Sequence, residues 1–437
     1  MADRPRVVII GGGFAGSEAA KRLKHAPVDV VVIDRTNHFV FQPLLYQVAT
    51  GGLAPSDISV AIRWLLRKQR NTRVVLGEVS RIDVANRRVE VDNGAVVEEY
   101  DFLIVAAGAR HSYFAHNEWE PYAPGLKTLE DALLVRERFL MAFEEAERAN
   151  DEATRAALQT LVIVGGGPTG VELAGMMSTI ARTALPHDFR RTDPSKAKVI
   201  LLEAGPRLLP TMPEELSARA KRDLEELGVD VRLGCMVTAA DEAGVRYEGV
   251  AEGVASEFIA ARAIFWAAGN KAASLGAQLG APLDRAGRIE VEPDLSVPGH
   301  PEVFVVGDLA TLPYKEGRRV PWVAPAAMQQ GRWAAANILR TLGRQPRKPF
   351  KYLNKGDLAT IGRHRAVADF GSFTVSGAIA WWFWLVVHIF YLAGFRNRLS
   401  VMLQWAWSYF TYQRGVRLIV SESHRKVGAP HGHALHA

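Results

Sequence analysis

The chain has 437 residues, 48% hydrophobic and 23% charged, a composition typical of a folded protein long enough for two or three domains. Its single cysteine, Cys235, excludes an internal disulfide, a dithiol redox centre and a cysteine-rich metal site. The formal charge of +6 does not favour nucleic acid, because most of the excess lies in the tryptophan-rich last 68 residues, where aromatic rings and cations suit a membrane interface.

The first forty residues predict a βαβ unit. Short β-branched runs at 6–10 and 28–33 flank a glycine cluster and a segment compatible with a helix. A secretory signal would have an apolar core and a cleavage site, whereas the first residues predict a strand and a glycine loop. We therefore expect a cytosolic starting compartment.

The glycine cluster has the spacing of a dinucleotide-binding loop. Gly11, Gly13 and Gly16 follow a strand and open a helix. Such glycines allow a tight turn, close approach of the backbone to a pyrophosphate, and close packing of helix on strand. Asp34 ends the next strand, where an acceptor for a ribose 2′-hydroxyl is expected. The segment predicts a dinucleotide site rather than a simple glycine turn.

The same pattern returns in the middle of the chain. An apolar run at 161–164 leads into glycines at 165–170, a helix-compatible segment follows, and 199–202 is the next strand. Both copies close with an apolar run that ends in Ala-Ala-Gly, at 102–108 and 264–269. One dinucleotide-binding fold is therefore predicted to occur twice.

The second glycine loop carries its own coenzyme preference. Gly165, Gly167 and Gly170 repeat the spacing, and Glu203 ends the following strand. Because Glu203 would repel a 2′-phosphate, NADH is favoured over NADPH. Arg207 leaves the alternative open, since an arginine can pair with that phosphate, although it also fits as a solvated loop charge. Two dinucleotide sites indicate an electron relay in which NADH reduces a flavin held by the first copy.

The later runs suggest how the domains alternate. The charge-rich segment 128–150 has helical spacing of apolar residues and is expected to form a surface helix at the start of the second domain. The run 303–306, followed by Gly-Asp, suggests a return to the first domain. The basic, proline-bearing segment 344–352 is typical of a crossing between domains.

Two aromatic segments follow the crossing. The first, 377–395, has nineteen residues, and as one helix it would reach about 28 Å, marginally enough to span a bilayer. The second, 399–412, is too short and too polar to span. With Arg396 and Arg398 between them, both are expected to lie on the membrane surface. A spanning helix and a buried dimer contact stay open as alternatives.

The order of these motifs resembles the two-dinucleotide-binding-domain flavoprotein oxidoreductases over residues 5–340. FQPLLYQVATG at 41–51, EAGPRLLP at 203–210 and MQQG at 328–331 are similar to type II NADH:quinone oxidoreductases. The C-terminal run HIFYLAGFRNRL, followed by WAWSYFTYQRGVRLI, is similar to the membrane-binding end of bacterial members. The resemblance implies an α/β fold of two Rossmann-like domains with a C-terminal membrane-binding helical module, FAD and NADH as cofactors, a membrane quinone as acceptor, and a homodimer.

The resemblance also implies which residues hold the cofactors. Asp308 would bind the ribityl chain of FAD, and the loop 43–45 would lie beside the isoalloxazine ring. The full set combines these positions with both glycine loops and the strand ends after them: Gly11, Gly13, Phe14, Ala15, Gly16, Asp34, Arg35, Pro43, Leu44, Leu45, Ala107, Gly108, Asp308, Gly165, Gly167, Gly170, Glu203 and Gly269. No metal site is expected, and three histidines near the end of the chain are interpreted as a frayed terminus: His431, His433 and His436.

Four side chains are expected to act in the reaction. Glu172 matches a family glutamate near the nicotinamide and flavin, where a buried carboxyl could hold or pass protons; a first-turn helix acid is the alternative. Gln329 and Gln330 match glutamines on the quinone side of the flavin, and Lys355 matches a nearby lysine or is a solvated charge. Pro325 replaces the first glutamine of the common motif AQxAxQQ, so a hydrogen bond from that position to a quinone oxygen is in question.

Cysteine chemistry separates this chain from other proteins of the same fold. Disulfide reductases, flavin peroxidases and sulfide:quinone oxidoreductases need reactive cysteines, whereas Cys235 is expected to be buried and structural. The acceptor must then meet the flavin directly. Besides quinone reduction, two alternatives stay open: a soluble NADH-dependent reductase of a ferredoxin- or rubredoxin-like carrier, and a flavin-based redox sensor. The sequence does not distinguish ubiquinone from menaquinone.

Domain boundaries follow from these motifs. We expect a discontinuous FAD-binding domain of residues 1–118 and 271–345, an NADH-binding domain of residues 119–270, and a membrane-associated region of residues 346–437. The predicted enzyme lies peripherally on the cytoplasmic face of the cell (inner) membrane, with quinone and lipid as partners. Because the sequence shows no set of spanning helices with buried charges, proton pumping is not expected.

Overall fold

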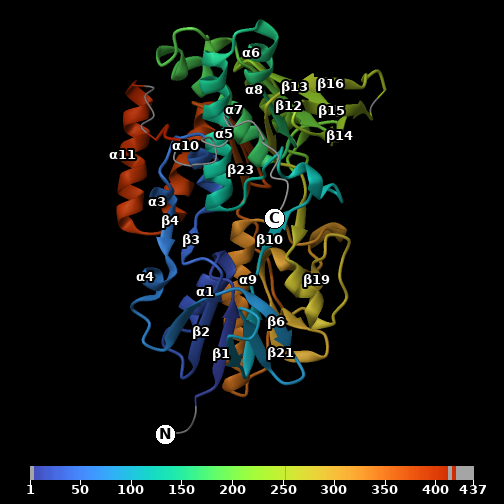
Figure 1. Ribbon diagram of the computed structural model, residues 1–437. Helices are drawn as coiled ribbons and strands as arrows, with labels where there is room; N and C mark the ends of the chain where they lie inside the picture. Colours follow the sequence, from blue (N-terminus) through green and yellow to red (C-terminus); the bar gives the residue numbers. More distant parts are fainter. Residues whose placement is uncertain (1–3, 251, 412–415, 420–437) are drawn as a thin grey trace, which may run out of the picture.

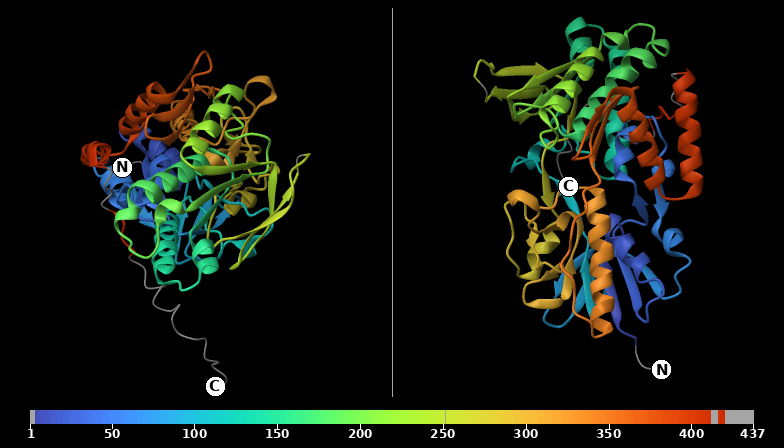
Figure 2. Two further views of the ribbon diagram at one scale, coloured as in Figure 1. Left: turned by 90° about the horizontal axis from the view of Figure 1, so that it is seen from above. Right: turned by 180° about the vertical axis from the view of Figure 1, so that it is seen from behind.

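The computed structural model describes residues 4–250, 252–411 and 416–419. Two lobes stand one above the other in Figure 1, and each is built around a sheet that is parallel except for the edge strand β20 of the lower one. Helices α10 (Gly377–Tyr391) and α11 (Phe395–Thr411) lie along one side of the molecule, as Figures 1 and 2 show from opposite directions.

The lower lobe contains the first predicted dinucleotide fold. Its sheet has the order β20-β21-β9-β1-β2-β5, and helices α1 (Phe14–Arg22) and α9 (Ala324–Leu342) pack together against it. Because strand β21 comes late in the chain and pairs in parallel with β9, the chain does return to this lobe. The strands are Ser296–Val297, His300–Val305, Phe102–Val105, Arg6–Ile10, Asp29–Asp34 and Thr72–Leu76, in sheet order.

The upper lobe repeats the plan. A four-stranded parallel sheet, β13-β12-β11-β17, consists of Val229–Leu233, Lys198–Glu203, Thr160–Val164 and Ala263–Trp266. Strands β11 and β17 are buried along their whole length, as parallel strands covered on both faces require. The helices of this lobe include α5 (Leu129–Arg148), α6 (Glu152–Leu158), α7 (Pro168–Thr183) and α8 (Glu214–Glu226). Helix α5 is amphipathic, with one buried face, as its spacing predicts.

The internal repeat extends beyond the parallel sheets. Each lobe adds a three-stranded antiparallel sheet, β6-β7-β8 below and β14-β15-β16 above. The strands that follow the two Ala-Ala-Gly runs, β10 (Ala109–His111) and β18 (Asn270–Ala272), pair with each other and connect the lobes. The added strands are Val79–Asp83, Arg88–Val91, Val96–Glu99, Cys235–Ala240, Gly244–Gly249 and Glu257–Ala260.

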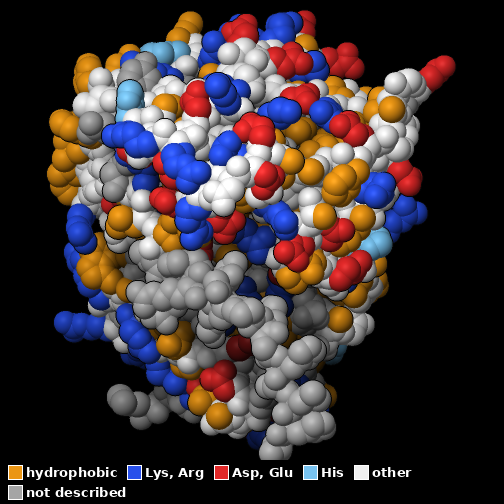
Figure 3. Space-filling model, turned by 45° about the horizontal axis from the view of Figure 1, so that its top comes forward, with side chains coloured by type: hydrophobic (Ala, Val, Ile, Leu, Met, Phe, Trp, Pro, Cys, Tyr) orange, Lys and Arg blue, Asp and Glu red, His pale blue; other side chains and the backbone are white. Residues whose placement is uncertain are grey.

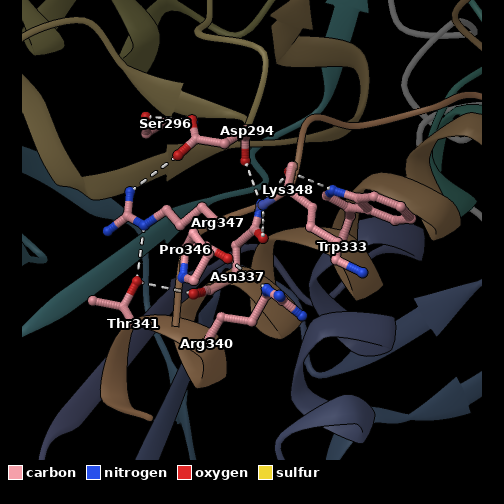
Figure 4. Close-up of polar contacts among 9 residues, drawn as sticks. All are labelled: Asp294, Ser296, Trp333, Asn337, Arg340, Thr341, Pro346, Arg347 and Lys348. Carbon is pink, nitrogen blue, oxygen red and sulfur yellow. Dashed lines mark hydrogen bonds and ion pairs between the residues drawn. The ribbon is translucent and has the colours of Figure 1, made fainter. Parts of the chain in front are cut away.

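The segment after α9 has no regular structure, but side chains hold it against the lower lobe (Figure 4). Asn337 donates from Nδ2 to the Lys348 carbonyl and accepts from the Lys348 N–H, both at 3.0 Å. The Trp333 indole donates to the same carbonyl at 2.9 Å, and Arg347 pairs with Asp294 at 3.2 Å. The segment predicted to cross between domains, 344–352, is therefore fixed against the lower lobe.

A further antiparallel sheet follows this segment, and the sequence analysis did not predict it. Strands β23 (Asp357–Gly362), β24 (Arg365–Asp369) and β25 (Thr374–Ser376) form an antiparallel sheet that packs against α7 of the upper lobe. Gly175 of α7 makes this packing possible, because a Cβ atom there would collide with the Ile361 carbonyl oxygen.

The expectation of one helix over 377–395 is wrong. Helix α10 ends at Tyr391, Leu392 is extended, and Gly394 has a φ of +88°, a left-handed conformation that glycine adopts without strain. Helix α11 then starts at Phe395, before the expected residue 399, while residue 412 lies outside the described part. Among the described residues, no helix combines the length and the apolar character needed to cross a membrane.

The inner side of the α10–α11 pair belongs to the main hydrophobic core. Trp384, Leu392 and Val401 are buried in the core cluster that includes the lower-lobe sheet. Helix α11 packs on α3 (Pro55–Ile58) and hydrogen-bonds to α2 (Leu45–Ala49) and β4 (Ser59–Ala61) of the lower lobe. Strand β3 (His38–Val40) and helix α4 (Ile62–Leu66) lie beside β4. The two helices are therefore integral to the fold.

Candidate functional site

The first glycine loop is shaped as a phosphate cradle. Gly11 has a φ of +96°, and a Cβ atom on Gly16 would collide with the Gly11 carbonyl oxygen. A Cβ atom on Gly13, in contrast, would have no neighbour within 4 Å, so the backbone at the start of α1 is open to a ligand. Open backbone N–H groups at a helix N-terminus favour bound phosphate.

Asp34 fixes this loop to the neighbouring strand. Its carboxylate accepts hydrogen bonds from the Gly12 N–H at 2.6 Å and from the Thr36 N–H and hydroxyl at 2.7 and 2.8 Å. The sequence analysis predicted Asp34 as a ribose acceptor; the structure adds that it braces the loop.

The second loop has the same construction. Gly165 has a φ of +113°, and a Cβ atom on Gly167 would again meet open space. Glu203 accepts from the Gly166 N–H at 2.5 Å and from the Gly205 N–H at 2.6 Å. The two glycine loops and their strand-end acids are thus equivalent in geometry as well as in sequence.

Arg207 is engaged within its own turn. Its guanidinium donates to the Pro210 carbonyl at 2.9 Å and the Met212 carbonyl at 3.0 Å. Pairing with a 2′-phosphate would compete with these two bonds, so the arrangement favours NADH, as the acid at Glu203 does.

One cavity of about 1520 Å³ joins both loops to the C-terminal region. Of the predicted residues, seventeen line it: Glu172, Lys355, Gly11, Gly13, Phe14, Ala15, Asp34, Arg35, Pro43, Leu45, Ala107, Gly108, Asp308, Gly165, Gly167, Glu203 and Gly269. The other five do not line it: Gly16, Leu44, Gly170, Gln329 and Gln330. Gly16 and Gly170 instead permit the close approach of each helix to its own loop.

Asp308 lines the same cavity, and a Cβ atom on the preceding Gly307 would lie 3.4 Å from the Cβ of Ala15, just after the first loop. Burial raises the pKa of the Asp308 carboxyl, and the nearby Lys127 opposes this rise. Gln330 holds this loop in place, because its buried amide oxygen accepts from the Gly307 N–H at 2.6 Å. Gln329 exchanges two hydrogen bonds with the Leu353 backbone, both at 3.0 Å. Both glutamines therefore position backbone, and their predicted role toward a quinone stays a prediction.

Glu172 lies on the first turns of α7, between the two loops and the C-terminal region. Burial raises the pKa of Glu172 to about 8, while the Thr360 N–H, 3.4 Å away, and the Trp384 indole oppose the rise. At neutral pH the carboxyl therefore holds a proton for most of the time. A first-turn acid placed only for the helix dipole would be solvated and ionised.

Lys355 lies at the cavity's C-terminal end. Its ammonium donates to the Tyr391 hydroxyl at 2.8 Å and lies 5.4 Å from the centre of that ring. The lysine is exposed, so both of its predicted interpretations are compatible with this position.

The sequence analysis did not assign a role to His388, although the residue lines the cavity. Its ring stacks on Trp384 with 4.2 Å between centroids and meets Phe41 edge-on. The Nδ1–H donates to the Trp384 carbonyl at 2.6 Å, which fixes the tautomer, and burial lowers the pKa of His388 to about 4. A neutral imidazole thus borders the FQPLL loop. The only sequence signal for this position was a single histidine within an apolar helix.

Cys235 is buried in β14, and burial raises the pKa of its thiol, as expected for a structural cysteine. The described residues contain no cluster of three metal-ligating side chains, and His431, His433 and His436 lie outside them.

Family models match nearly the whole chain. The pyridine nucleotide-disulphide oxidoreductase model covers residues 5–331, and the NDH2 C-terminal domain model covers residues 354–412. The second model thus covers the unpredicted sheet together with α10 and α11. Although the first description includes disulphide chemistry, the single cysteine excludes a dithiol centre here.

Curated relatives agree with the family models. The type II NADH:quinone oxidoreductase Ndh of Mycobacterium tuberculosis is 46% identical over 428 residues, which is 96% of this chain and 91% of that protein. The corresponding protein of Haemophilus influenzae is 30% identical and covers 83% of this chain and 86% of its own.

Solved structures share the fold. NDH2 from Plasmodium falciparum in complex with NADH superposes with a TM-score of 0.87 at 20% identity, over 96% of this chain and all of that one. The sulfide:quinone oxidoreductase of Aquifex aeolicus gives 0.72 at 21% identity, over 94% of this chain and 96% of that one. The predicted α/β fold class is confirmed, and the two loops fit FAD and NADH, the cofactors that the resemblance implies. By its family models and its relatives, the chain belongs to the type II NADH:quinone oxidoreductases.

Proposed function

We propose that this chain oxidises NADH and reduces a membrane quinone, without proton pumping, at the cytoplasmic face of the cell (inner) membrane. The observation that carries the proposal is the single cavity that reaches from both glycine loops to Lys355, His388 and Tyr391 of the C-terminal region. A continuous cavity allows a donor and an acceptor to approach one flavin without a separate protein carrier.

The residues around this cavity would have different roles. Gly11 and Gly13 would hold the FAD pyrophosphate, with Asp34 on its ribose and Asp308 on its ribityl chain. The second loop and Glu203 would hold NADH. When bound, FAD accepts a hydride equivalent and releases electrons to the quinone.

Quinone reduction to the quinol takes two electrons and two protons; one proton comes with the hydride equivalent from NADH, and Glu172 would supply the other. Its pKa of about 8 keeps the carboxyl protonated at neutral pH, and it lies between the loops and the C-terminal end of the cavity. A carboxyl with a pKa near the working pH can both donate and recover a proton in each cycle. Lys355 would stabilise negative charge that develops on a quinone oxygen.

The outer face of α10 and α11 would contact the membrane. Its large apolar side chains have no cover within the described structure, a pattern typical of an interfacial surface. More than 60% of each of these side chains is exposed: Ile379, Val386, Phe390, Phe395, Leu403, Trp407 and Phe410. A second copy of the chain, as the resemblance implies for a homodimer, would compete for part of this face.

An anaerobic stopped-flow experiment tests the reaction. NADH is mixed with the yellow enzyme, a short-chain quinone follows, and NADPH and an iron–sulfur carrier serve as controls. We expect fast bleaching of the flavin by NADH and fast recovery with quinone. Fast bleaching with slow recovery would contradict quinone reduction and favour the carrier reductase or the sensor.

A further inference from the structure

An unusual run of charge surrounds α4 in the lower lobe. Between Asp57 and Glu78 the sequence has five basic residues and no acid: Arg63, Arg67, Lys68, Arg70 and Arg73. Arg73 pairs with Glu98 at 2.7 Å. The other four are exposed, and none forms an ion pair with a described residue.

Trp64 lies within this cationic run and is 47% exposed. The Arg67 guanidinium lies 3.8 Å from the centre of the indole and also donates to the Trp64 carbonyl at 2.7 Å. An exposed tryptophan on a short helix adds little to the core. Together with cations, it is typical of a membrane–water interface, where the ring lies at the depth of the headgroups.

Helix α4 is fixed beside the start of α11. A Cβ atom on Gly394, in the turn between α10 and α11, would lie 3.9 Å from the Trp64 ring. Asn397 donates to the Ser59 carbonyl at 3.1 Å, and the Ser400 hydroxyl donates to Asp57 at 2.9 Å. These bonds hold the residues that precede α4 against the first turns of α11.

The surface of α4 is therefore continuous with the apolar face of the two C-terminal helices. Phe395, at the first position of α11, is 81% exposed, and the neighbouring Arg396 is exposed as well. Figures 1 and 2 place α4 and α11 on the same side of the molecule. Along that edge, at the left of Figure 3, Lys and Arg side chains gather next to hydrophobic ones.

From this arrangement we propose that α4 forms a second membrane-contact surface, in which Trp64 enters the headgroup layer and four cations bind the phosphates of anionic lipids: Arg63, Arg67, Lys68 and Arg70. The inference rests on the proposed membrane docking of α10 and α11 and extends it to the lower lobe. Four exposed cations with no ion pair among the described residues, beside an apolar face, match an anionic headgroup layer, which attracts clustered lysine and arginine.

Two contacts would also fix the orientation of the enzyme. If only the two neighbouring helices α10 and α11 contacted the bilayer, the enzyme could rotate about the helix axes while staying bound. A lipid contact on α4, outside the helix pair, would restrict that rotation and keep the same cavity entrance against the bilayer.

The test uses the full-length, FAD-loaded enzyme and co-sedimentation with two kinds of vesicle. One kind is phosphatidylcholine alone, and the other contains equal parts of phosphatidylcholine and phosphatidylglycerol. The variant replaces the four cations with glutamine: Arg63→Gln, Arg67→Gln, Lys68→Gln and Arg70→Gln. The matched control removes the same charge at exposed positions elsewhere: Arg246→Gln, Arg262→Gln, Lys271→Gln and Arg285→Gln.

We expect partitioning of the variant to the anionic vesicles to fall by at least about tenfold, because each cation near an anionic surface adds to binding. Its binding to phosphatidylcholine, its FAD content and its NADH-to-soluble-dye rate should match those of the wild type. The control should bind both vesicles as the wild type does. Because added salt screens charges, it should weaken anionic binding of the wild type more than that of the variant.

Four results would overturn the inference. Equal binding of variant and wild type to the anionic vesicles would confine the membrane contact to α10 and α11. An equal loss on both kinds of vesicle, or a loss in the control as large as in the variant, would mean that α4 does not recognise lipid charge. If the wild type bound neither kind, the proposed membrane docking itself would fail, and this extension with it.

Discussion

Two strand-end acids illustrate how one residue can serve both fold and specificity. Asp34 and Glu203 each accept an N–H from the middle glycine of the loop in front of them. Their sequence positions predict ribose binding, and a carboxylate suits both tasks, because its two oxygens can accept from the loop and still offer lone pairs to a ligand. The bracing bond was not predictable, because it depends on how closely loop and strand end approach.

We predict that Glu203→Gln relaxes the preference for NADH. Removing the negative charge removes the repulsion of a 2′-phosphate, so the ratio of kcat/KM for NADPH to that for NADH should rise about tenfold. Steady-state rates with both coenzymes measure it. Glu248→Gln, an exposed acid of the same lobe, is the control and should leave the ratio unchanged. An unchanged ratio in Glu203→Gln would contradict the assignment.

Glu172 allows a prediction with a defined pH range. Because burial raises its pKa to about 8, the carboxyl is protonated below that pH and ionised above it. Quinone reduction that uses this proton should therefore slow as the pH rises through about 8. Glu172→Gln cannot supply the proton, and its rate should be at least about tenfold lower and nearly independent of pH in that range.

The measurement is NADH:quinone reductase activity between neutral and alkaline pH, with flavin absorbance as the check on cofactor content. Flavin content should stay normal, because the Glu172 carboxyl accepts its hydrogen bond from the Thr360 N–H and not from either glycine loop. A variant with the wild-type rate and pH profile would remove Glu172 from the reaction.

At the scale of elements, the sequence predicts what local patterns determine. The glycine loops, their strands and α5 follow from turn chemistry and apolar spacing, which act within about twenty residues. The sheet β23–β25 was missed because its strands are short and are buried by helices from other parts of the fold, α7 and α8 on β23 and α10 on β24. The break between α10 and α11 was missed because the apolar run continues through Gly394, whose left-handed conformation depends on how both helices dock.

The packing of β23 on α7 should depend on Gly175. We predict that Gly175→Ala lowers the free energy of unfolding by about 1–3 kcal/mol, because the added methyl group collides with the Ile361 carbonyl and must push β23 away from α7. Thermal unfolding of the FAD-loaded enzyme measures the change.

Gly343→Ala is the matched control. Gly343 is exposed after the end of α9, and its nearest neighbour would lie 3.4 Å from the new Cβ atom, an ordinary contact. That variant should keep the wild-type Tm or exceed it slightly, since alanine restricts the unfolded chain more than glycine does. Equal Tm values for both variants and the wild type would show that α7 and β23 are not tightly packed.

On the scale of the whole molecule, the C-terminal pair cannot be treated as a detachable anchor. Trp384, Leu392 and Val401 lie in the main core, and Gln404 donates to Asp57 of α3 at 2.9 Å. Removing α10 and α11 would therefore expose core surface and confuse loss of membrane binding with loss of stability. Substitutions on the outer face separate the two effects.

We predict that the double variant Phe390→Ser, Leu403→Ser binds vesicles more weakly but oxidises NADH at the wild-type rate. Both side chains are more than 60% exposed, one on each helix, so their loss removes apolar area from the outer face without opening a cavity. Vesicle co-sedimentation should fall about tenfold, and NADH-to-soluble-dye activity should be unchanged. Phe258→Ser, Leu283→Ser removes two exposed apolar side chains elsewhere and should sediment as the wild type does. If both double variants stayed with the vesicles, apolar contact through α10 and α11 would not be what holds the enzyme on the bilayer.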